Sequence, residues 1–109
     1  MRVLFDNGTP RGVATALSEH VVVEARTHGW DTLRNGELLD SAERSGYDVF
    51  VTTDRNIRYQ QNLSGRRIAI VVLGAGRWRL IKNKLAEIAS AVSASTPGSF
   101  TEVEVPNNL

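Results

Sequence analysis

The sequence contains no cysteine, and this absence excludes several classes of protein at once. Disulfide frameworks, thiolate zinc sites and cysteine nucleophiles are ruled out, and such a chain suits a reducing cytoplasm. Histidine occurs only as His20 and His28, neither with a partner at a readable spacing, so imidazole metal clusters and nucleophile–histidine pairs are not expected. No apolar run approaches the ~18 residues that span a bilayer, and nothing after Met1 resembles a signal peptide. We expect a cytoplasmic protein with no membrane contact, whose metal chemistry, if any, uses carboxylate and amide oxygens.

Two nucleotide-binding loops are also missing. Gly74-Ala75-Gly76 follows an apolar run, but a dinucleotide-binding motif needs a third glycine at position 79, where the chain has arginine. No suitably placed acid follows it to bind a ribose, and no phosphate-binding motif ending in Gly-Lys-Ser/Thr occurs. The short glycine segment is better interpreted as a hinge into the next helix.

Acidic residues are absent from residues 55 to 84, although the whole chain has a net charge of only +1. Nine acids and five bases precede this segment, and three acids and no base follow it. A basic segment of this kind predicts either a surface for a polyanion or several solvated helix faces that point in different directions. The sequence leaves both open for its eight basic side chains, Arg55, Arg58, Arg66, Arg67, Arg77, Arg79, Lys82 and Lys84.

Apolar runs alternate with helical patterns along the chain. We expect strands over residues 2–5, 20–24, 48–52 and 67–73 and an edge strand over 101–105, separated by helices over about 9–18, 35–45, 54–61 and 77–92. This alternation predicts one three-layer α/β domain, residues 1–109, around a mostly parallel sheet of four to five strands. The run 67–73 is almost continuously apolar, which is typical of a central strand.

The last expected helix carries an apolar stripe that should pack against the sheet. Its members recur at spacings of three and four residues, so we expect all of them in the core. The stripe consists of Trp78, Ile81, Leu85, Ile88 and Val92.

Carboxylates follow two of the expected strands directly. Asp6 comes after residues 3–5 and Asp54 follows residues 49–51 past two threonines. If both strands are parallel, the two acids share the sheet edge where open α/β proteins bind ligands. Glu37, in the helix that begins near Asn35, could bring a third oxygen to the same rim, and oxygen donors of this kind predict a hard divalent metal. The alternative is that Asp6 and Asp54 only cap the helices that follow them.

A phosphoreceiver domain has a similar arrangement of acids but needs two features that this chain lacks. Receivers carry paired acids after the first strand, where this chain has Asp6-Asn7. They also carry a lysine after the last core strand, whereas the first lysine here is Lys82. This interpretation is therefore disfavoured.

Three segments resemble a known family. Phe5-Asp6-Asn7-Gly8-Thr9-Pro10, Asn35-Gly36-Glu37-Leu38-Leu39 and Val51-Thr52-Thr53-Asp54-Arg55-Asn56-Ile57 are similar to the small PIN-like proteins of the DUF5615 family, which are related to the Mut7-C domain and distantly to the VapC toxins. The similarity runs in order to about Leu73, roughly two thirds of the chain. It implies a PIN-like fold and a Mg2+- or Mn2+-dependent ribonuclease of toxin–antitoxin type.

The resemblance also implies roles for individual residues. Asp6, Glu37 and Asp54 would be catalytic metal ligands, with Asn7 and Asn35 supplying amide oxygens or orienting water. Many relatives have an acid at the position of Asn35, so a degraded module that binds RNA or a partner protein is the alternative. Asp31 is a weak candidate for a further acid. The RNA substrate would be held by Arg11, Arg55, Arg58 and Tyr59, and a small antitoxin protein and a homodimer are the expected partners.

Overall fold

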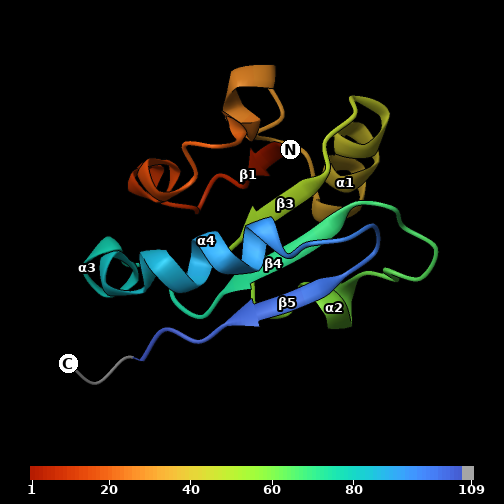
Figure 1. Ribbon diagram of the computed structural model, residues 1–109. Helices are drawn as coiled ribbons and strands as arrows, with labels where there is room; N and C mark the ends of the chain where they lie inside the picture. The colour runs from red at the N-terminus through yellow and green to blue at the C-terminus, as the bar shows by residue number, and fades with distance from the viewer. Residues whose placement is uncertain (107–109) are drawn as a thin grey trace.

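The computed structural model describes residues 1–106 and shows five strands in one sheet (Figure 1). All strand pairs are parallel, and the order across the sheet is β2-β1-β3-β4-β5. The predicted α/β class with a parallel sheet is confirmed, and residues 107–109 of the predicted domain lie outside the described part. The strands are β1 (Arg2–Phe5), β2 (Val21–Glu24), β3 (Val49–Thr52), β4 (Ala69–Leu73) and β5 (Phe100–Val103).

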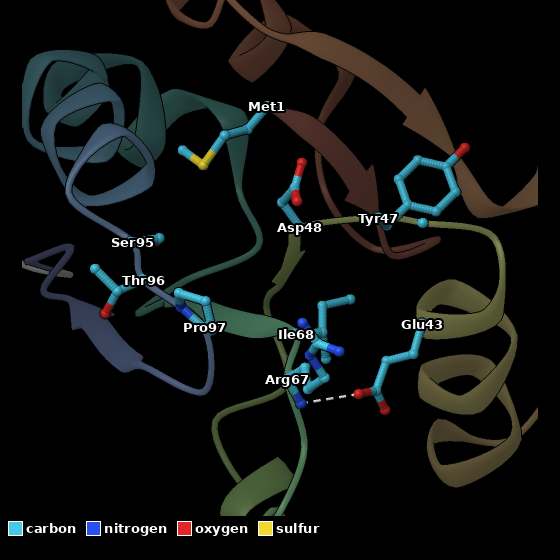
Figure 2. Close-up of a pocket in the computed structure, with 10 residues that line it drawn as sticks. Met1, Glu43, Tyr47, Asp48, Arg67, Ile68, Ser95, Thr96 and Pro97 are labelled. Carbon is cyan, nitrogen blue, oxygen red and sulfur yellow. Dashed lines mark hydrogen bonds between the residues drawn. The ribbon is translucent and has the colours of Figure 1, made fainter.

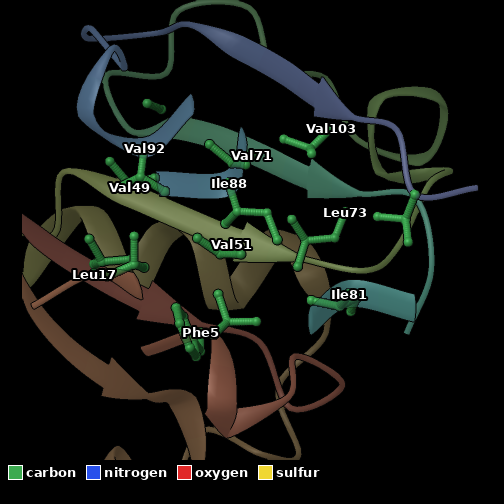
Figure 3. Close-up of a cluster of buried hydrophobic side chains, with 14 of the residues drawn as sticks. Phe5, Leu17, Val49, Val51, Val71, Leu73, Ile81, Ile88, Val92 and Val103 are labelled. Atoms are coloured by element: carbon green, nitrogen blue, oxygen red, sulfur yellow. The ribbon is translucent and has the colours of Figure 1, made fainter. Parts of the chain in front are cut away.

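Helices cover both faces of the sheet and form the two outer layers. One face packs against the 3-10 helix η1 (Arg11–Ala16) and against α3 (Trp78–Ile81), η3 (Lys82–Lys84) and α4 (Leu85–Ser93). Figure 3 shows this core, in which Phe5, Val51 and Val71 from the strands meet Ile88 and Val92 from α4.

The opposite face has its own core. It packs against η2 (Ala25–His28), α1 (Asn35–Arg44) and α2 (Ile57–Gln60). Leu4, Phe50 and Ile70 point to this side because successive residues of a strand alternate between faces. Residues of β3 and β4 are buried on both sides, which confirms that 67–73 contains a central strand.

Two helix starts differ from the prediction. Thr9 was expected to cap a helix over 9–18, but its hydroxyl donates instead to the Val51 carbonyl at 3.0 Å, and a short 3-10 helix begins at Arg11. The helix expected from Asp54 begins at Ile57, after a turn. In both cases a polar side chain is held by the neighbouring strand or turn, so the helix starts later than the local sequence indicates.

The predicted helix over 77–92 is interrupted, but most of its apolar stripe still packs against the sheet. α3 ends at Ile81, η3 separates it from α4, and Leu85 is partly buried against the same core. Ile81, Ile88 and Val92 are buried as expected, and Leu80 is buried too. Trp78 is 41% exposed, so the prediction that it belongs to the core is wrong.

The strand order reverses between β1 and β3. From β1 the chain moves outward to β2, and then returns to the other side of β1 to form β3. The connections after β1 and β3 therefore leave the sheet in opposite directions, and ligands of open α/β proteins bind at such a switch point. Within residues 1–106 no helix is long and apolar enough to cross a membrane.

Candidate metal centre at the carboxyl edge of the sheet

Asp6 and Asp54 lie at the carboxyl ends of the adjacent strands β1 and β3. Asp6 is the residue after β1, and its backbone N–H still donates to the Val51 carbonyl of β3 at 2.9 Å. Asp54 is two residues beyond the end of β3. The two carboxylates thus share one edge of the sheet, at the switch point, as the sequence predicts.

The Thr52 hydroxyl joins the two acidic residues. It donates to the Asp6 Oδ2 atom at 2.8 Å and accepts the backbone N–H of Asp54 at 3.0 Å. Thr52 is fully buried, so its hydroxyl is fixed in this bridging position. The second oxygen of Asp6, Oδ1, accepts the N–H of Asn7 at 2.8 Å. Asp6 caps no helix, because η1 begins five residues later.

Asp54 accepts one hydrogen bond on each carboxylate oxygen. Oδ1 accepts the backbone N–H of Asn56 at 3.0 Å, which stabilises the turn before α2, and Oδ2 accepts the Asn35 side-chain amide at 2.8 Å. Asn35 is the first residue of α1, so its side chain ties this helix to the end of β3. Asp54 therefore stabilises a local turn with one oxygen and binds the first residue of α1 with the other.

No cation balances the two carboxylates among the described residues. All their hydrogen-bond donors are neutral, and neither Asp6 nor Asp54 forms an ion pair within residues 1–106. Half-buried carboxylates are stabilised by a positive charge, and a hard divalent cation prefers oxygen ligands. The donor set fits such an ion, although the described chain brings together no group of three acidic, histidine or cysteine side chains.

Asn7, the residue after Asp6, has a side-chain oxygen without a partner in the described part of the chain. Its side-chain amide donates to the Asp31 carbonyl at 3.2 Å, and its Oδ1 atom is buried without a hydrogen-bond donor among residues 1–106. A buried acceptor with no partner costs free energy unless some donor or cation satisfies it. The Asn7 oxygen, on the loop after β1, is therefore available for the predicted role of an amide-oxygen ligand.

Glu37 lies in the first turn of α1 and is exposed. Its Oε1 atom accepts the Arg34 backbone N–H at 3.4 Å, and it forms no contact with Asp6 or Asp54 among the side-chain hydrogen bonds of residues 1–106. Asp31 reaches the centre only through its backbone carbonyl. Asp6 and Asp54 are therefore the two acids that the tertiary structure brings to one threonine.

Three of the four predicted nucleic-acid contacts lie near one another and Arg11 lies apart: Arg58 is 5.9 Å from the Tyr59 ring, and its partner Glu102 lines the same cavity as Arg55. Arg11 pairs with Glu24 at 2.7 Å, and Arg58 lies over the Phe100 ring at 4.6 Å, with Glu102 3.8 Å away. Arg55 lines a cavity of about 300 Å3 at the carboxyl ends of β4 and β5. Tyr59 is 80% exposed. None of the four forms an ion pair or side-chain hydrogen bond with the two acids in the described part of the chain.

The basic segment 55–84 is divided between the two edges of the sheet. Arg66 and Arg67 precede β4 and so lie at the amino edge, where Figure 2 shows Arg67 beside a cavity of about 290 Å3. Arg66 pairs there with Asp40 at 2.8 Å and with Glu43 at 2.6 Å. The segment does not form one continuous polyanion surface, because parallel strands place their two ends on opposite edges.

The amino-edge cluster perturbs the ionisation of its members. Partial burial raises the pKa of Glu43, but the hydrogen bond from the Arg67 N–H and the contact with Arg66 together hold this pKa below its ordinary value. Burial lowers the pKa of Arg66, but Glu43 and Asp40 outweigh it and raise this pKa above its ordinary value. Both shifts favour the charged pair.

The two histidines take part in structural contacts. His20 Nε2 lies 3.3 Å from the Ser93 hydroxyl, so it connects β2 to α4. His28 stacks on Trp30 with ring centroids 4.1 Å apart, and its Nε2 atom lies 2.6 Å from the Tyr47 hydroxyl. Neither contact involves Asp6 or Asp54.

Sequence reasoning missed the roles of the threonines between β3 and Asp54. Thr52 bridges the two acids, and Thr53 lies where two glycine loops meet: a Cβ at Gly8 would lie 3.0 Å from its hydroxyl, and one at Gly76 3.8 Å. The Thr-x-Asp spacing was visible in the sequence, but Asp6, which accepts the hydrogen bond of the Thr52 hydroxyl, is 46 residues away.

Comparison with protein-family models, curated proteins and solved structures finds no match to this chain.

Proposed function

We propose that this protein is a metal-dependent ribonuclease that hydrolyses RNA phosphodiesters with Mg2+ or Mn2+ held by Asp6 and Asp54. One observation carries the proposal: at the β1/β3 switch point the Thr52 hydroxyl joins the Asp6 carboxylate to the backbone N–H of Asp54, and neither acid has a cationic partner within residues 1–106. Such a pair has the charge and the ligand type that a divalent cation needs.

The chemistry would follow from oxygen ligands and requires no protein nucleophile. A bound divalent cation lowers the pKa of a water molecule and offsets the charge that builds on the phosphate. Each of the four carboxylate oxygens accepts one hydrogen bond, which orients it and leaves a lone pair for a ligand. Thr52 and Asn35 are positioning residues in this scheme, because they hold Asp6 and Asp54 by one hydrogen bond each.

The choice of RNA and the cellular setting rest on the resemblance to PIN-like proteins. On that basis we place the protein in the cytoplasm, as part of a toxin–antitoxin system, with a small antitoxin that neutralises it. A homodimer belongs to the same proposal. Glu37, a candidate ligand by resemblance, would need to leave the Arg34 N–H to join the centre.

A second function is favoured by Asn35. Where many of the resembled proteins have an acid, this side chain presents an N–H to Asp54, and an N–H cannot bind a cation. With two carboxylates and no third, the domain could bind RNA or a partner protein without cleaving it. The two functions differ in whether divalent metal binds and whether RNA is cut.

Asp54→Asn tests the proposal by removing charge without changing shape. The amide oxygen of the variant still accepts the Asn56 N–H, so we expect the free energy of unfolding to change by less than about 1 kcal/mol. Metal-dependent cleavage of single-stranded RNA should fall at least about 100-fold, because a ligand charge is lost. Cleavage is measured with Mn2+ and Mg2+ on a labelled RNA, alongside urea unfolding of each variant.

Asp48→Asn is the matched control. Asp48 lies at the amino edge and also accepts a backbone N–H, from Arg2 at 2.8 Å, so the same chemical change is made away from the centre. This variant should cleave RNA like the wild type. Absence of cleavage by the wild type with either metal, or equal cleavage by wild type and Asp54→Asn, would reject the nuclease and favour the binding module.

A further inference from the structure

Trp78 is an exposed aromatic side chain at the carboxyl edge of the sheet. It is the first residue of α3 and is 41% exposed, whereas Leu80 and Ile81 of the same helix are buried. Figure 1 shows α3 and the orange-red η1 at the same end of the sheet. An indole with one part exposed can still stack on a flat ligand, because its ring is large, rigid and apolar.

The Trp78 ring is seated on the backbone of Gly12. A Cβ at Gly12 would lie 2.5, 2.7 and 2.8 Å from three consecutive carbons of the six-membered ring, so any larger residue would displace the indole. The three distances are nearly equal, which places the Gly12 backbone over the face of the ring rather than beside its edge. One face of the indole is therefore supported by η1, and the ring is held in place without being buried.

This ring lies close along the rim to the acidic centre. Gly76, two residues before Trp78, approaches Thr53, and a Cβ there would lie 3.8 Å from the threonine hydroxyl. Thr53 stands between Thr52, which bridges the acids, and Asp54 itself. The chain thus passes from the side of the centre to Trp78 within two residues.

Basic residues flank Trp78 in the chain. Arg77 and Arg79 are both exposed and form no ion pair within residues 1–106. Arg11 precedes the glycine that supports the ring and is also exposed, although it pairs with Glu24. Two free guanidinium groups beside a half-exposed, supported indole are the elements of a single-strand binding site, in which bases stack on aromatics and phosphates meet cations.

We infer that Trp78 is a stacking platform for an unpaired base of a single-stranded RNA, with Arg77 and Arg79 contacting the adjoining phosphates. This inference rests on the proposed function, since the platform would hold the strand next to the Asp6–Asp54 centre. The bases of a duplex are already paired and stacked, so the platform selects single-stranded RNA. The other exposed aromatic side chain, Tyr59, which the sequence analysis names as an RNA contact, is on α2, which covers the opposite face of the sheet.

The test measures binding in EDTA, where no metal-dependent cleavage can occur. A labelled single-stranded RNA 10-mer is titrated with wild type, Trp78→Leu, Trp78→Phe and, as matched controls, Trp30→Phe and Tyr59→Leu. Trp78→Leu should bind about five- to 100-fold more weakly, Trp78→Phe should keep most of the affinity, and both controls should bind like the wild type. Wild-type affinity of Trp78→Leu, or no binding of the RNA by the wild type, overturns the inference.

Fluorescence gives a second readout that does not depend on altering Trp78. The chain has two tryptophans, so in Trp30→Phe all tryptophan emission comes from Trp78. Single-stranded RNA should quench this emission, and a duplex of the same sequence should leave it unchanged. Binding of the single strand without any change in emission overturns the platform.

The two proposals can fail separately. Asp54→Asn should bind the single strand in EDTA at least as tightly as the wild type, because the platform does not use that carboxylate and its removal lowers the repulsion of the RNA phosphates. If RNA binds and quenches Trp78 but is never cleaved with Mn2+, the nuclease fails and the platform stands. If RNA is cleaved but Trp78→Leu binds normally, the platform fails and the nuclease stands.

Discussion

Two acidic side chains lie at each edge of the sheet, the carboxyl edge and the amino edge, and the two pairs differ in the partners they bind. At the amino edge, Asp40 and Glu43 share the guanidinium of Arg66, at 2.8 and 2.6 Å. At the carboxyl edge, Asp6 and Asp54 receive hydrogen bonds only from neutral donors. The first cluster has its cation within the chain, whereas the second has no balancing positive charge among residues 1–106.

This difference separates a structural cluster from a candidate binding centre more clearly than residue type does. An acid with an internal cation contributes to folding and gains little from an added metal ion. Two acids that are oriented by neutral donors retain their charge and their free lone pairs for a ligand. The comparison therefore predicts that metal ions act at one edge and that ion-pair variants destabilise the other.

The largest expected effect sharpens the comparison at the carboxyl edge. Thr52→Val removes the hydroxyl that orients Asp6 and accepts the Asp54 N–H, so we expect Mn2+ to bind about 10- to 100-fold more weakly. Isothermal titration with Mn2+ measures this. Thr52→Ser keeps the hydroxyl and should retain most of the affinity, and equal affinities of the folded valine and serine variants would contradict the positioning role.

An intermediate effect is expected at the amino edge. Arg66→Met leaves Glu43, whose side chain is 25% exposed, without its cation, and should lower the free energy of unfolding by about 1–3 kcal/mol. Urea unfolding measures the loss. Arg79→Met, at an exposed site, should change stability by less than about 0.5 kcal/mol. If Arg66→Met is as stable as the wild type, the amino-edge ion pairs do not stabilise the fold. If the variant loses Mn2+ binding, the metal does not act at the carboxyl edge alone.

The smallest expected effect is a change of stability with pH. The pKa of Glu43 is held below its ordinary value of 4.5, so its contribution is complete above about pH 4.5 and is lost as the pH falls through the lowered value. Thermal unfolding between pH 6 and pH 3 should therefore show a smaller loss of stability in Glu43→Gln than in the wild type. Parallel pH profiles of the two proteins would show that the amino-edge cluster contributes no such linkage.

Much of the fold could be predicted because its signals are local. Apolar runs predicted the first four strands, the alternation over residues 101–105 predicted the edge strand, and the apolar run over 67–73 correctly indicated a central strand. Gly46 lies just after α1 and has a positive φ of 81°, as is common for a glycine that ends a helix. The element boundaries near Thr9 and Asp54 were wrong because their side chains bond across the sheet or within a turn.

The site was predictable only in part. The positions of Asp6 and Asp54 at strand ends were enough to place both on one edge, because parallel strands end together. The predicted strand over 67–73 already separates Arg66 and Arg67 from the basic residues after it, but the ion pairs of Arg66 were not visible. The exposure of Trp78 was missed because its ring lies against Gly12 of η1, a contact between distant parts of the chain.

The sequence by itself determined the strand–helix alternation, the parallel sheet and the placement of two acids at the ends of strands. These follow from hydrophobic periodicity and from residues that are neighbours in the chain. The tertiary structure decided which acids meet a cation, which threonine joins Asp6 to Asp54, and which aromatic stays exposed. These features depend on contacts between residues tens of positions apart, and such contacts exist only once the strands have paired.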